Sequence, residues 1–437
     1  MSPKSSFEHD CFTVTAHFQK AYQNTDLTPL IYPDQLEKFW VEYGRESLEA
    51  LVQLVEDHAA QDAKIIFSGH RGCGKSTLLA QFGRAMSDRY FVTFFSISDL
   101  IEMSDVNHIN ILFAIAVNLM LEAEKQQIEI PKGTRDSFHK WFAKRTRTEI
   151  ETPVNAEVAI GFDLFKIISG KLKTESSIRD EIKQEFKRNV SELVAKLNEI
   201  AATIQAASHK DVLVIIDDLD KLDLAVVREI FLEHGQTFLL PSFNIIFEVP
   251  ISALYDIYLS SIFTNIFDES IVVIPAIKVI DRGSDFSPDP VVEKNVRSLC
   301  EILYRRIPAD LFDASIAEQI VLKSGGILRE LVRISNRCCR VCLTEIRRKP
   351  DLINLRISQE ILNKVIQGMR LDFEMTLGLE DYEVLLDIHK NPSSKRSDSQ
   401  TFLKLLNGLH ILEYRNSEIW YCIHPIVKEI LEIKGLI

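Results

Sequence analysis

The segment that most constrains the fold is a glycine-rich stretch at residues 63–82. It opens with an apolar run at 65–67, which is typical of a buried strand, and continues with the pattern G-x-x-x-x-G-K-S at 69–76. Residues 77–82 then have the apolar spacing of a helix. A strand, a glycine-rich turn and a helix in this order are what a phosphate-binding loop requires. We therefore expect an α/β domain that binds a nucleotide, and a purely structural glycine turn is the alternative.

Each residue type in this loop has a physical reason to be there. Gly69, Gly72 and Gly74 allow positive φ angles, which bring backbone N–H groups against phosphate oxygens. The following helix adds the positive end of its dipole. Lys75 supplies a point charge for the β- and γ-phosphates, and the Ser76 hydroxyl can ligate Mg²⁺. The candidate nucleotide-binding residues of the loop are Gly69, Arg71, Gly72, Cys73, Gly74, Lys75, Ser76 and Thr77.

A pair of acids ends a second apolar run, at residues 211–217. The unbroken apolar run suits a central strand of a parallel sheet. Asp217 would then lie at the carboxyl end of the strand, where such sheets bind ligands, and could hold Mg²⁺ directly or through water. Asp218 is the candidate base that deprotonates an attacking water, although Asp reaches less far than Glu. The alternative is an acidic turn without a catalytic role.

Further apolar runs at 90–96, 243–249 and 270–275 predict buried strands. Strands that alternate with helices predict a parallel sheet covered by helices on both faces, over residues 45–280. Residues 101–208 are mostly helical in pattern and predict an insertion into this domain.

Two parts of the insertion are read less directly from their periodicity. Residues 155–173 fit a hairpin or a helix equally well, and residues 179–206 fit one long amphipathic helix. Residues 1–33 show no clear periodicity, and we expect residues 1–44 to form an N-terminal arm with a helix near its end.

A stretch rich in Gly, Ser, Asp and Pro at 281–290 predicts a domain boundary. Helical patterns follow it at 291–307, 314–323, 327–348 and 358–375 and predict a helical domain over 291–375. Residues 380–437 predict a helix, a second helix, a hairpin and a last helix, which is the outline of a winged-helix module. Within it, Ser397 and Gln400 would form the capping box of the second helix, and Asn416 and Ser417 the hairpin turn.

Arg329 is the candidate site residue of the helical domain. It follows Gly325 and Gly326, which allow a tight turn, and it belongs to the first turn of the next helix. A guanidinium aimed at the nucleotide would contact the γ-phosphate and respond to its loss. A surface arginine in a salt bridge is the alternative. Cys338, Cys339 and Cys342 in the same helix have no histidine nearby, so we interpret them as small buried apolar residues.

Composition limits the partners. The 437 residues are 46% hydrophobic and 26% charged, as in a soluble protein of two or three domains. No apolar run approaches the ~20 residues of a membrane span, and the N-terminus has no signal-peptide pattern, so we expect a cytoplasmic protein without a membrane partner. The formal net charge of −12 argues against tight non-specific nucleic-acid binding, which needs many cations.

Four motifs together resemble those of the AAA+ and STAND P-loop ATPases, especially initiator-type ATPases and STAND-like proteins of bacterial antiphage defence. These motifs are Gly44-Arg45-Glu46, the loop, Ile215-Ile-Asp-Asp, and Gly-Gly-x-x-Arg at 325–329. The resemblance implies ATP and Mg²⁺ as cofactors, Arg45 near the adenine, and Ser76 and Asp217 as metal ligands. It also implies that Asp218 is the base and Arg329 the lid sensor.

The chain departs from the family pattern at two places. A polar sensor residue should end the strand at 243–249, yet Pro250 follows it and leaves only Glu248 and Ser252 as candidates. Residues 250–276 contain no Arg or Lys to act as an arginine finger, so the finger would come from elsewhere, with Arg282 one candidate, or hydrolysis would be slow.

We therefore expect an ATP-hydrolysing switch that controls self-assembly or a protein effector. One alternative is a DNA-associated ATPase of replication, partition or transposition, and another is a nucleotide-dependent scaffold without turnover. DNA binding is less favoured, because the C-terminal module offers few cations, Lys395, Arg396 and Lys404. The loop pattern does not distinguish ATP from GTP.

Overall fold

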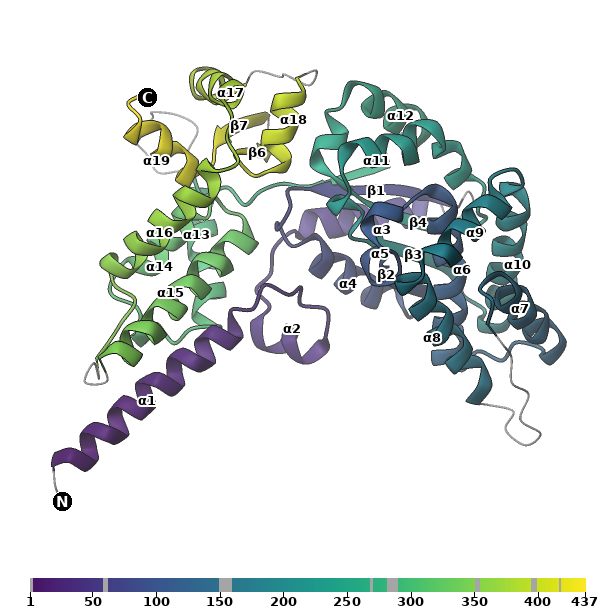
Figure 1. Cartoon of the computed structure of the whole chain (residues 1–437), viewed down its shortest axis with the longest axis horizontal. Coiled ribbons are helices and arrows are strands. Elements are labelled where there is room, and N and C mark those ends of the chain that lie inside the picture. The colour runs from purple at the N-terminus through teal and green to yellow at the C-terminus, as the bar shows by residue number, and fades with distance from the viewer. Residues whose placement is uncertain are drawn as a thin grey trace. The chain divides into compact units, whose positions relative to one another are not determined.

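The computed structural model describes residues 3–57, 62–148, 159–267, 270–280, 290–349, 354–393, 399–415 and 418–437 (Figure 1). The chain divides into two compact units. The terminal unit comprises Met1–Tyr43, Gly69–Thr77 and Ile274–Ile437, and the sheet unit comprises Gly44–Ser68 and Leu78–Val273.

The sheet has five strands in the order β2-β3-β4-β1-β5. They are β1 (Lys64–Gly69), β2 (Tyr90–Ser96), β3 (Asp211–Asp217), β4 (Asn244–Pro250) and β5 (Ile271–Ile274). β3 runs parallel to β2 on one side and to β4 on the other. Nearly every residue of β1, β3 and β4 is buried, because helices flank the sheet. The predicted α/β fold with a buried parallel sheet is thus confirmed.

One helix of the sheet unit is buried almost all round. The α-helices of this unit are α3 (Arg45–Asp57), α4 (Lys75–Met86) from Leu78 onward, α5 (Ile97–Leu100), α6 (His108–Lys125), α7 (Lys132–Arg145), α8 (Ala159–Thr174), α9 (Ser176–Phe186), α10 (Val190–Ser208), α11 (Leu224–Arg228) and α12 (Ile257–Phe267). α6 contacts β2 as well as α8, α9 and α10, and its apolar residues form part of the main core. A helix that is apolar on every side belongs inside a protein, as this one does.

The structure decides both open questions in the insertion. Residues 159–174 form the helix α8, so the hairpin alternative is wrong for the described part of 155–173. The single helix expected over 179–206 is also wrong, because α9 ends at Phe186 and α10 begins at Val190. Residues 187–189 are polar and exposed, so no apolar side chain holds that turn against the core. Pro250 also differs from expectation, because it belongs to β4 rather than following it.

The helical part of the terminal unit includes a segment from the N-terminus. Its helices are α1 (Pro3–Asn24), α2 (Pro33–Phe39), α13 (Pro290–Tyr304), α14 (Ile316–Lys323), α15 (Leu328–Arg348) and α16 (Gln359–Glu374). α1, for which we expected no periodicity, packs against α15 (Figure 1). Phe18 and Ala21 of α1 enter the same core as Leu331 and Ile334 of α15. The apolar contacts with α15 stabilise a helix that its own sequence pattern does not predict.

The three cysteines of α15 are buried in this core. Burial raises the pKa of the Cys339 thiol to about 12 and raises those of Cys338 and Cys342 as well. The thiols therefore stay neutral and pack as small apolar groups, as the sequence indicates.

The C-terminal residues follow the predicted order of elements. They form α17 (Leu379–Lys390), α18 (Gln400–Asn407), β6 (Ile411–Arg415), β7 (Ile419–Ile423) and α19 (Pro425–Ile433), with β6 and β7 antiparallel. The N-cap of α18 is Ser399, whose Oγ accepts the N–H of Phe402 at 3.3 Å. This corrects the expected capping box, because Gln400 is the first residue of the helix rather than the third, and Ser397 lies outside the described residues. The expected turn residues Asn416 and Ser417 lie outside them too.

In the part of the chain that the structure describes, no helix combines the length and hydrophobicity needed to cross a membrane.

Candidate functional site

The glycine-rich loop joins β1 to α4 (Lys75–Met86), as the sequence predicts. Gly69, Gly72 and Gly74 have φ angles of +156°, +87° and +95°. Side chains rarely allow these angles, so the loop depends on glycine for its path. Positive φ angles of this kind turn successive backbone N–H groups toward a common point, which is how such loops hold phosphates.

Close packing is a second reason why two of these positions require glycine. A Cβ added to Gly72 would lie 2.5 Å from Cβ of Arg329, and one added to Gly74 would lie 2.0 Å from Oη of Tyr43. The Tyr43 hydroxyl also donates a hydrogen bond to the Gly74 carbonyl at 3.1 Å. The loop is therefore shaped by its neighbours in the terminal unit as well as by the demands of a ligand.

Lys75 is buried, with 3% of its surface exposed. Its Nζ donates hydrogen bonds to the carbonyl oxygens of Gly69 and His70, each at 3.1 Å. The ammonium thus lies over the loop that precedes it, where a phosphate-binding cation is expected.

The remaining loop residues differ in their surroundings. Arg71 is exposed, Cys73 is buried and Ser76 is half-buried. The Thr77 hydroxyl accepts the N–H of Leu30 at 3.0 Å, so it already bonds to the N-terminal segment. The candidate roles of these four residues in nucleotide binding stay predictions.

His70 is a residue of the loop to which the sequence analysis assigned no role. Its ring is fully buried, and its Nε2 accepts the N–H of Glu413 in β6 at 2.7 Å. Burial lowers the pKa of His70 to about 3, helped by the charges of Lys75 and Arg415. The ring is therefore neutral at physiological pH, which keeps Nε2 an acceptor. A histidine at a variable loop position carries no sequence signal for such a contact.

Arg329 contacts the loop through its backbone, and its role as a sensor of the γ-phosphate stays a prediction. Its N–H donates to the Gly72 carbonyl at 2.9 Å, and its side chain is half-buried. Gly326 allows the turn at 325–329 to lie against the backbone of Ile277, because a Cβ there would lie 1.8 Å from the Ile277 carbonyl oxygen. The turn at 325–329 therefore places the first residues of α15 beside the loop.

An acidic cluster lies in the sheet unit at the carboxyl ends of β3 and β4. Carboxylate oxygens of Asp217, Asp218 and Glu248 all lie within 4.8 Å of one another. Asp217 and Glu248 are 5% and 1% exposed. Asp217 and Glu248 are 31 residues apart in the chain and converge because β3 and β4 are neighbours in the sheet. Glu248 Oε2 also accepts the N–H of Asp218 at 2.6 Å. Oxygen ligands grouped in this way suit Mg²⁺.

Asp218 is held by hydrogen bonds on both carboxylate oxygens. Its Oδ2 accepts from the hydroxyls of Ser96 at 2.5 Å and Ser98 at 2.7 Å, and its Oδ1 pairs with Lys221 at 2.6 Å. Burial alone would raise the pKa of Asp218, but the bonds from Lys221, Ser96 and Ser98 outweigh it and lower the pKa. A carboxylate stabilised in this way takes up a proton less readily than an ordinary aspartate.

Arg45 lies on an exposed part of α3, where its Nε pairs with Glu49 at 2.8 Å. The two side chains are 72% and 64% exposed. Beside them is a small cavity of about 310 Å³ with Leu48 and Val52 in its wall. The contact expected between Arg45 and an adenine ring stays a prediction.

Among the other residues that the sequence analysis raised, Ser252 is buried just after β4. Arg282, the alternative arginine finger, lies outside the described residues, as do Lys395 and Arg396. Lys404 pairs with Asp381 at 2.7 Å.

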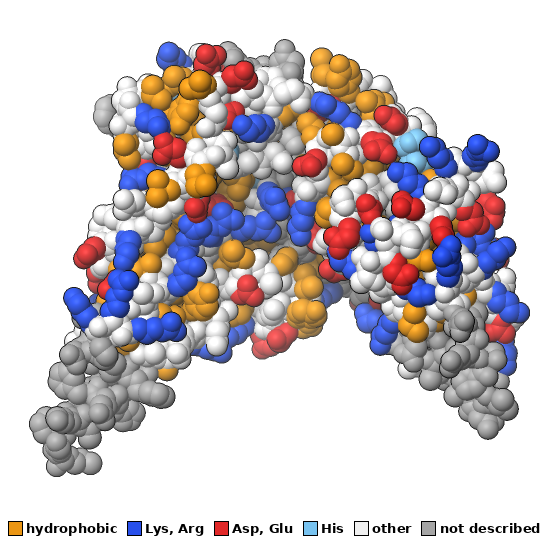
Figure 2. Space-filling model, viewed as in Figure 1, with side chains coloured by type: hydrophobic (Ala, Val, Ile, Leu, Met, Phe, Trp, Pro, Cys, Tyr) orange, Lys and Arg blue, Asp and Glu red, His pale blue; other side chains and the backbone are white. Residues whose placement is uncertain are grey.

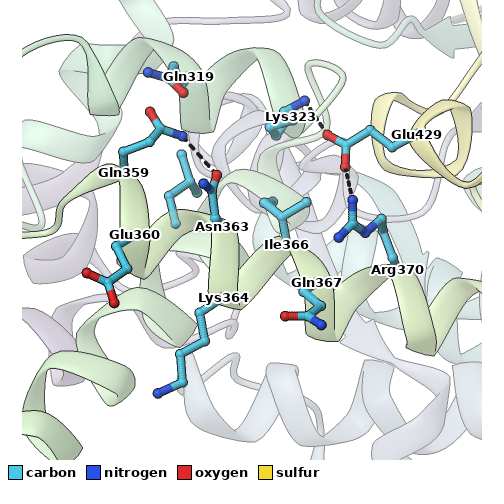
Figure 3. Close-up of a pocket in the computed structure, with 11 residues that line it drawn as sticks. Gln319, Lys323, Gln359, Glu360, Asn363, Lys364, Ile366, Gln367, Arg370 and Glu429 are labelled. Atoms are coloured by element: carbon cyan, nitrogen blue, oxygen red, sulfur yellow. Dashed lines mark hydrogen bonds and ion pairs between the residues drawn. The ribbon is translucent and has the colours of Figure 1, made fainter. Parts of the chain in front are cut away.

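A separate polar cavity of about 620 Å³ lies between α14, α16 and α19 (Figure 3). Glu429 of α19 reaches into it and pairs with Lys323 of α14 and with Arg370 of α16, the latter at 3.0 Å. These ion pairs hold α19 to the other two helices, so the charges of the cavity serve packing.

Two solved structures are similar to most of the chain. The Walker-type ATPase paby2304 of Pyrococcus abyssi is 15% identical, with 94% of this chain and 99% of that chain covered and a TM-score of 0.41. The Aeropyrum pernix ORC1 protein, solved in complex with DNA, is 12% identical, with 93% and 97% covered and a TM-score of 0.36. Similarity at this level does not extend to function.

No curated protein matches the chain. Residues 46–248 match the family described as the KAP family P-loop domain. The match includes the loop, the acidic cluster and most of the sheet, and it covers less than half of the chain. This part of the chain is therefore similar to the P-loop NTPase domains of the KAP family.

Proposed function

We propose that the protein is a molecular switch that binds and hydrolyses ATP and whose nucleotide state controls its assembly or a protein effector. The observation that carries the proposal is the loop between β1 and α4, with three glycines at positive φ and a buried Lys75 over the loop carbonyls. Its place in a segment similar to P-loop NTPase domains supports the same conclusion.

Lys75, the loop N–H groups and the N-terminus of α4 would bind the phosphates. We infer Ser76 and Asp217 as Mg²⁺ ligands from their places in the two sequence motifs. Bound Mg²⁺ would neutralise charge on the transferred phosphate. The buried carboxylate oxygens of the acidic cluster are a donor set that suits this ion. Arg329, whose backbone contacts Gly72, is the proposed sensor of the γ-phosphate.

Two carboxylates compete for the role of general base. The sequence motif points to Asp218, but its oxygens are already hydrogen-bonded and its pKa is lowered. Glu248 lies in the same cluster and is one methylene longer, which makes it the alternative, and its Oε2 accepts the Asp218 N–H. The comparison of Asp218→Asn with Glu248→Gln separates the two.

Substitution of the loop lysine tests the proposal. Lys75→Ala should abolish or severely weaken ATP binding, measured by calorimetry, and leave the circular dichroism spectrum intact. Lys125→Ala is the matched control, because Lys125 is an exposed lysine that pairs with Glu122 in α6. Unchanged ATP affinity in Lys75→Ala would contradict the nucleotide-binding proposal.

Differential affinity of ATP and ADP for two arrangements would supply the energy of the switch. Residues 291–375 would act as a lid, and residues 380–437 as a winged-helix-like module, in keeping with the order of their elements. Light scattering with ATP, ADP and no nucleotide tests control of self-assembly. A scaffold without turnover would show the same ATP-dependent size but no phosphate release.

We propose antiphage defence as the biological setting, because the combination of motifs resembles that of STAND-like defence proteins. Phage plating on cells that express the wild type or Lys75→Ala tests this setting. Equal plating on both would argue against it.

A DNA-associated ATPase is the second candidate, and one surface favours it. Lys and Arg side chains gather over the part of the molecule where α15 is drawn (Figure 2). Arg333, Arg337 and Arg340 recur at intervals of four and three in α15, so they share a helix face. Arg333 pairs with Glu330 at 3.1 Å and Arg337 with Asp372 at 2.7 Å, which lowers the net charge of the stripe. The charge that these three arginines retain would support weak contacts with DNA phosphates.

A further inference from the structure

We propose that His70 is a positioning residue that couples the phosphate loop to the C-terminal hairpin, so that the hairpin and nucleotide binding influence each other. The proposal rests on the proposed nucleotide site and names a regulator of it, the hairpin formed by β6 and β7. The coupling would make the C-terminal hairpin a part of the chain that responds to the occupied loop.

The direct contact is a buried hydrogen bond between distant residues. His70 and Glu413 are 343 positions apart, and the 2.7 Å bond joins the imidazole Nε2 to a backbone N–H. Because the N–H of Glu413 points to His70, the histidine satisfies a donor at the edge of β6. Both residues are fully or almost fully buried, at 0% and 1% exposed, so water does not compete for the bond.

His70 also holds the loop lysine through its backbone. Its carbonyl accepts a hydrogen bond from Lys75 Nζ at 3.1 Å. One residue thus contacts the hairpin through its ring and the proposed phosphate-binding cation through its carbonyl. A shift of β6 that moves the ring would move the carbonyl that holds Lys75.

A second route connects the same two parts. The Tyr414 hydroxyl donates to the Gly325 carbonyl at 2.7 Å, and a Cβ on Gly325 would lie 2.4 Å from the Leu412 side chain. Arg329, at the other end of that turn, donates its N–H to the Gly72 carbonyl. The turn at 325–329 therefore lies between the hairpin and the loop and contacts both.

Side-chain contacts within the hairpin hold its residues together. Tyr414 stacks on Trp420 across the two strands, with ring centroids 4.7 Å apart. The Glu413 carboxylate, 1% exposed, accepts from Arg415 at 2.7 Å. The stacked rings join β6 to β7, so we expect a change at His70 to reach both strands.

Coupling of this kind is reciprocal, and substitutions at His70 can distinguish it from a role in packing alone. A histidine that only fills space would tolerate an aromatic ring of similar size without a change in coupling. His70→Phe keeps a buried ring and removes the acceptor, whereas His70→Gln keeps a side-chain oxygen that can accept. His424 offers a matched control, because it is also fully buried and accepts a backbone N–H, but from Ile426 rather than from β6.

The test combines calorimetry with hydrogen exchange in the full-length chain, using Mg²⁺ and a non-hydrolysable ATP analogue. In the wild type we expect the analogue to slow exchange of the β6 amides. His70→Phe should lose that response and change the analogue's Kd by about fivefold or more, the lower end of measured coupling effects. His70→Gln should restore part of both effects, and His424→Phe should keep both.

The outcomes are distinct. If the wild type binds the analogue and His70→Phe keeps the wild-type Kd and exchange response, the coupling is wrong and the proposed function stands. If the wild type binds no nucleotide, both are wrong. Equal loss of the response in His70→Phe and His424→Phe would indicate general destabilisation of the hairpin and would also overturn the specific role of His70.

Discussion

The close packing of the turn before Arg329 can be tested by measuring how much a substitution there destabilises the protein. We consider Gly326→Ala. Gly326 has a φ of +76°, and a Cβ there would lie 1.8 Å from the Ile277 carbonyl oxygen. The same backbone segment is held by a 3.3 Å hydrogen bond from the Ile277 N–H to the Gly326 carbonyl. The substitution therefore forces two backbone segments apart.

Substitutions at two other glycines separate the contributions to the loss of stability expected in Gly326→Ala. Gly435 has a similar φ of +67° but nothing within 4 Å of its added Cβ, so Gly435→Ala measures the backbone cost alone. That cost is about 1 kcal/mol, from left-handed strain partly offset by reduced freedom of the unfolded chain. Gly170 is helical with open space around it, so Gly170→Ala should stabilise by roughly 0.5–1 kcal/mol. For Gly326→Ala, overpacking adds about 1–3 kcal/mol or more, for a total near 3 kcal/mol.

Gly170→Ala is tested by urea unfolding followed by tryptophan fluorescence with Trp141 present, because Gly170 and Trp141 both belong to the sheet unit. Gly326→Ala and Gly435→Ala are compared by the same unfolding in a Trp141→Phe background. The two remaining tryptophans, Trp40 and Trp420, belong to the terminal unit and report on its unfolding. ATP affinity should fall in Gly326→Ala, because displacement of the turn disturbs the Arg329–Gly72 contact. A loss of stability in Gly326→Ala no larger than that of Gly435→Ala would refute the packing argument.

Three further predictions concern the acidic cluster and the basic stripe. Removal of the general base should slow ATP turnover by about 10² to 10⁴ without loss of ATP binding. If Asp218 is the base, as the motif predicts, Asp218→Asn should show this loss. Normal turnover in Asp218→Asn together with slow turnover in Glu248→Gln would assign the base to Glu248 instead. Ser98→Ala should destabilise the protein at pH 7 by about 1.5–3 kcal/mol, because it removes a hydrogen bond to a charged carboxylate. Because the pKa of Asp218 is lowered, the folded protein gains stability at pH values above 3.8, the ordinary pKa, and loses this gain as the pH falls through the lowered pKa. The difference in unfolding free energy between wild type and Ser98→Ala, measured in urea, should therefore shrink toward low pH. A pH-independent difference would contradict the role of Ser98 in stabilising the Asp218 carboxylate. In fluorescence anisotropy, the wild type should bind duplex DNA no more tightly than about micromolar at 150 mM salt, and tighter binding that Arg340→Glu removes would promote the DNA-associated candidate.

Local patterns were enough to predict the elements that carry the proposed chemistry. The order of apolar run, glycine-rich turn and helical spacing places the loop between β1 and α4. The apolar run that ends in Asp217 is β3, and the helical patterns after residue 290 correspond to α13 to α19 with small differences at their ends. These features depend on residues that are close in the chain, and their backbone conformation follows from local sterics and burial.

Elements whose stability comes from distant contacts were predicted less well. α1 shows no clear pattern, yet it forms because Phe18 and Ala21 pack into the core of the terminal unit. The break between α9 and α10 at residues 187–189 interrupts a pattern that continues through it. For α1, tertiary packing outweighs the local preference, whereas at 187–189 the polar, exposed residues lack apolar contacts that would continue the helix.

By itself, then, the sequence determined that a glycine-rich loop follows one buried strand and that an acid pair ends another. Only the tertiary structure decided what lies beside them. Glu248 joins Asp218 because β4 is the sheet neighbour of β3, and the ring of His70 bonds to Glu413 across 343 positions of chain. Strand order and contacts between distant segments are set by the packing of the whole core, and no spacing in the sequence records them.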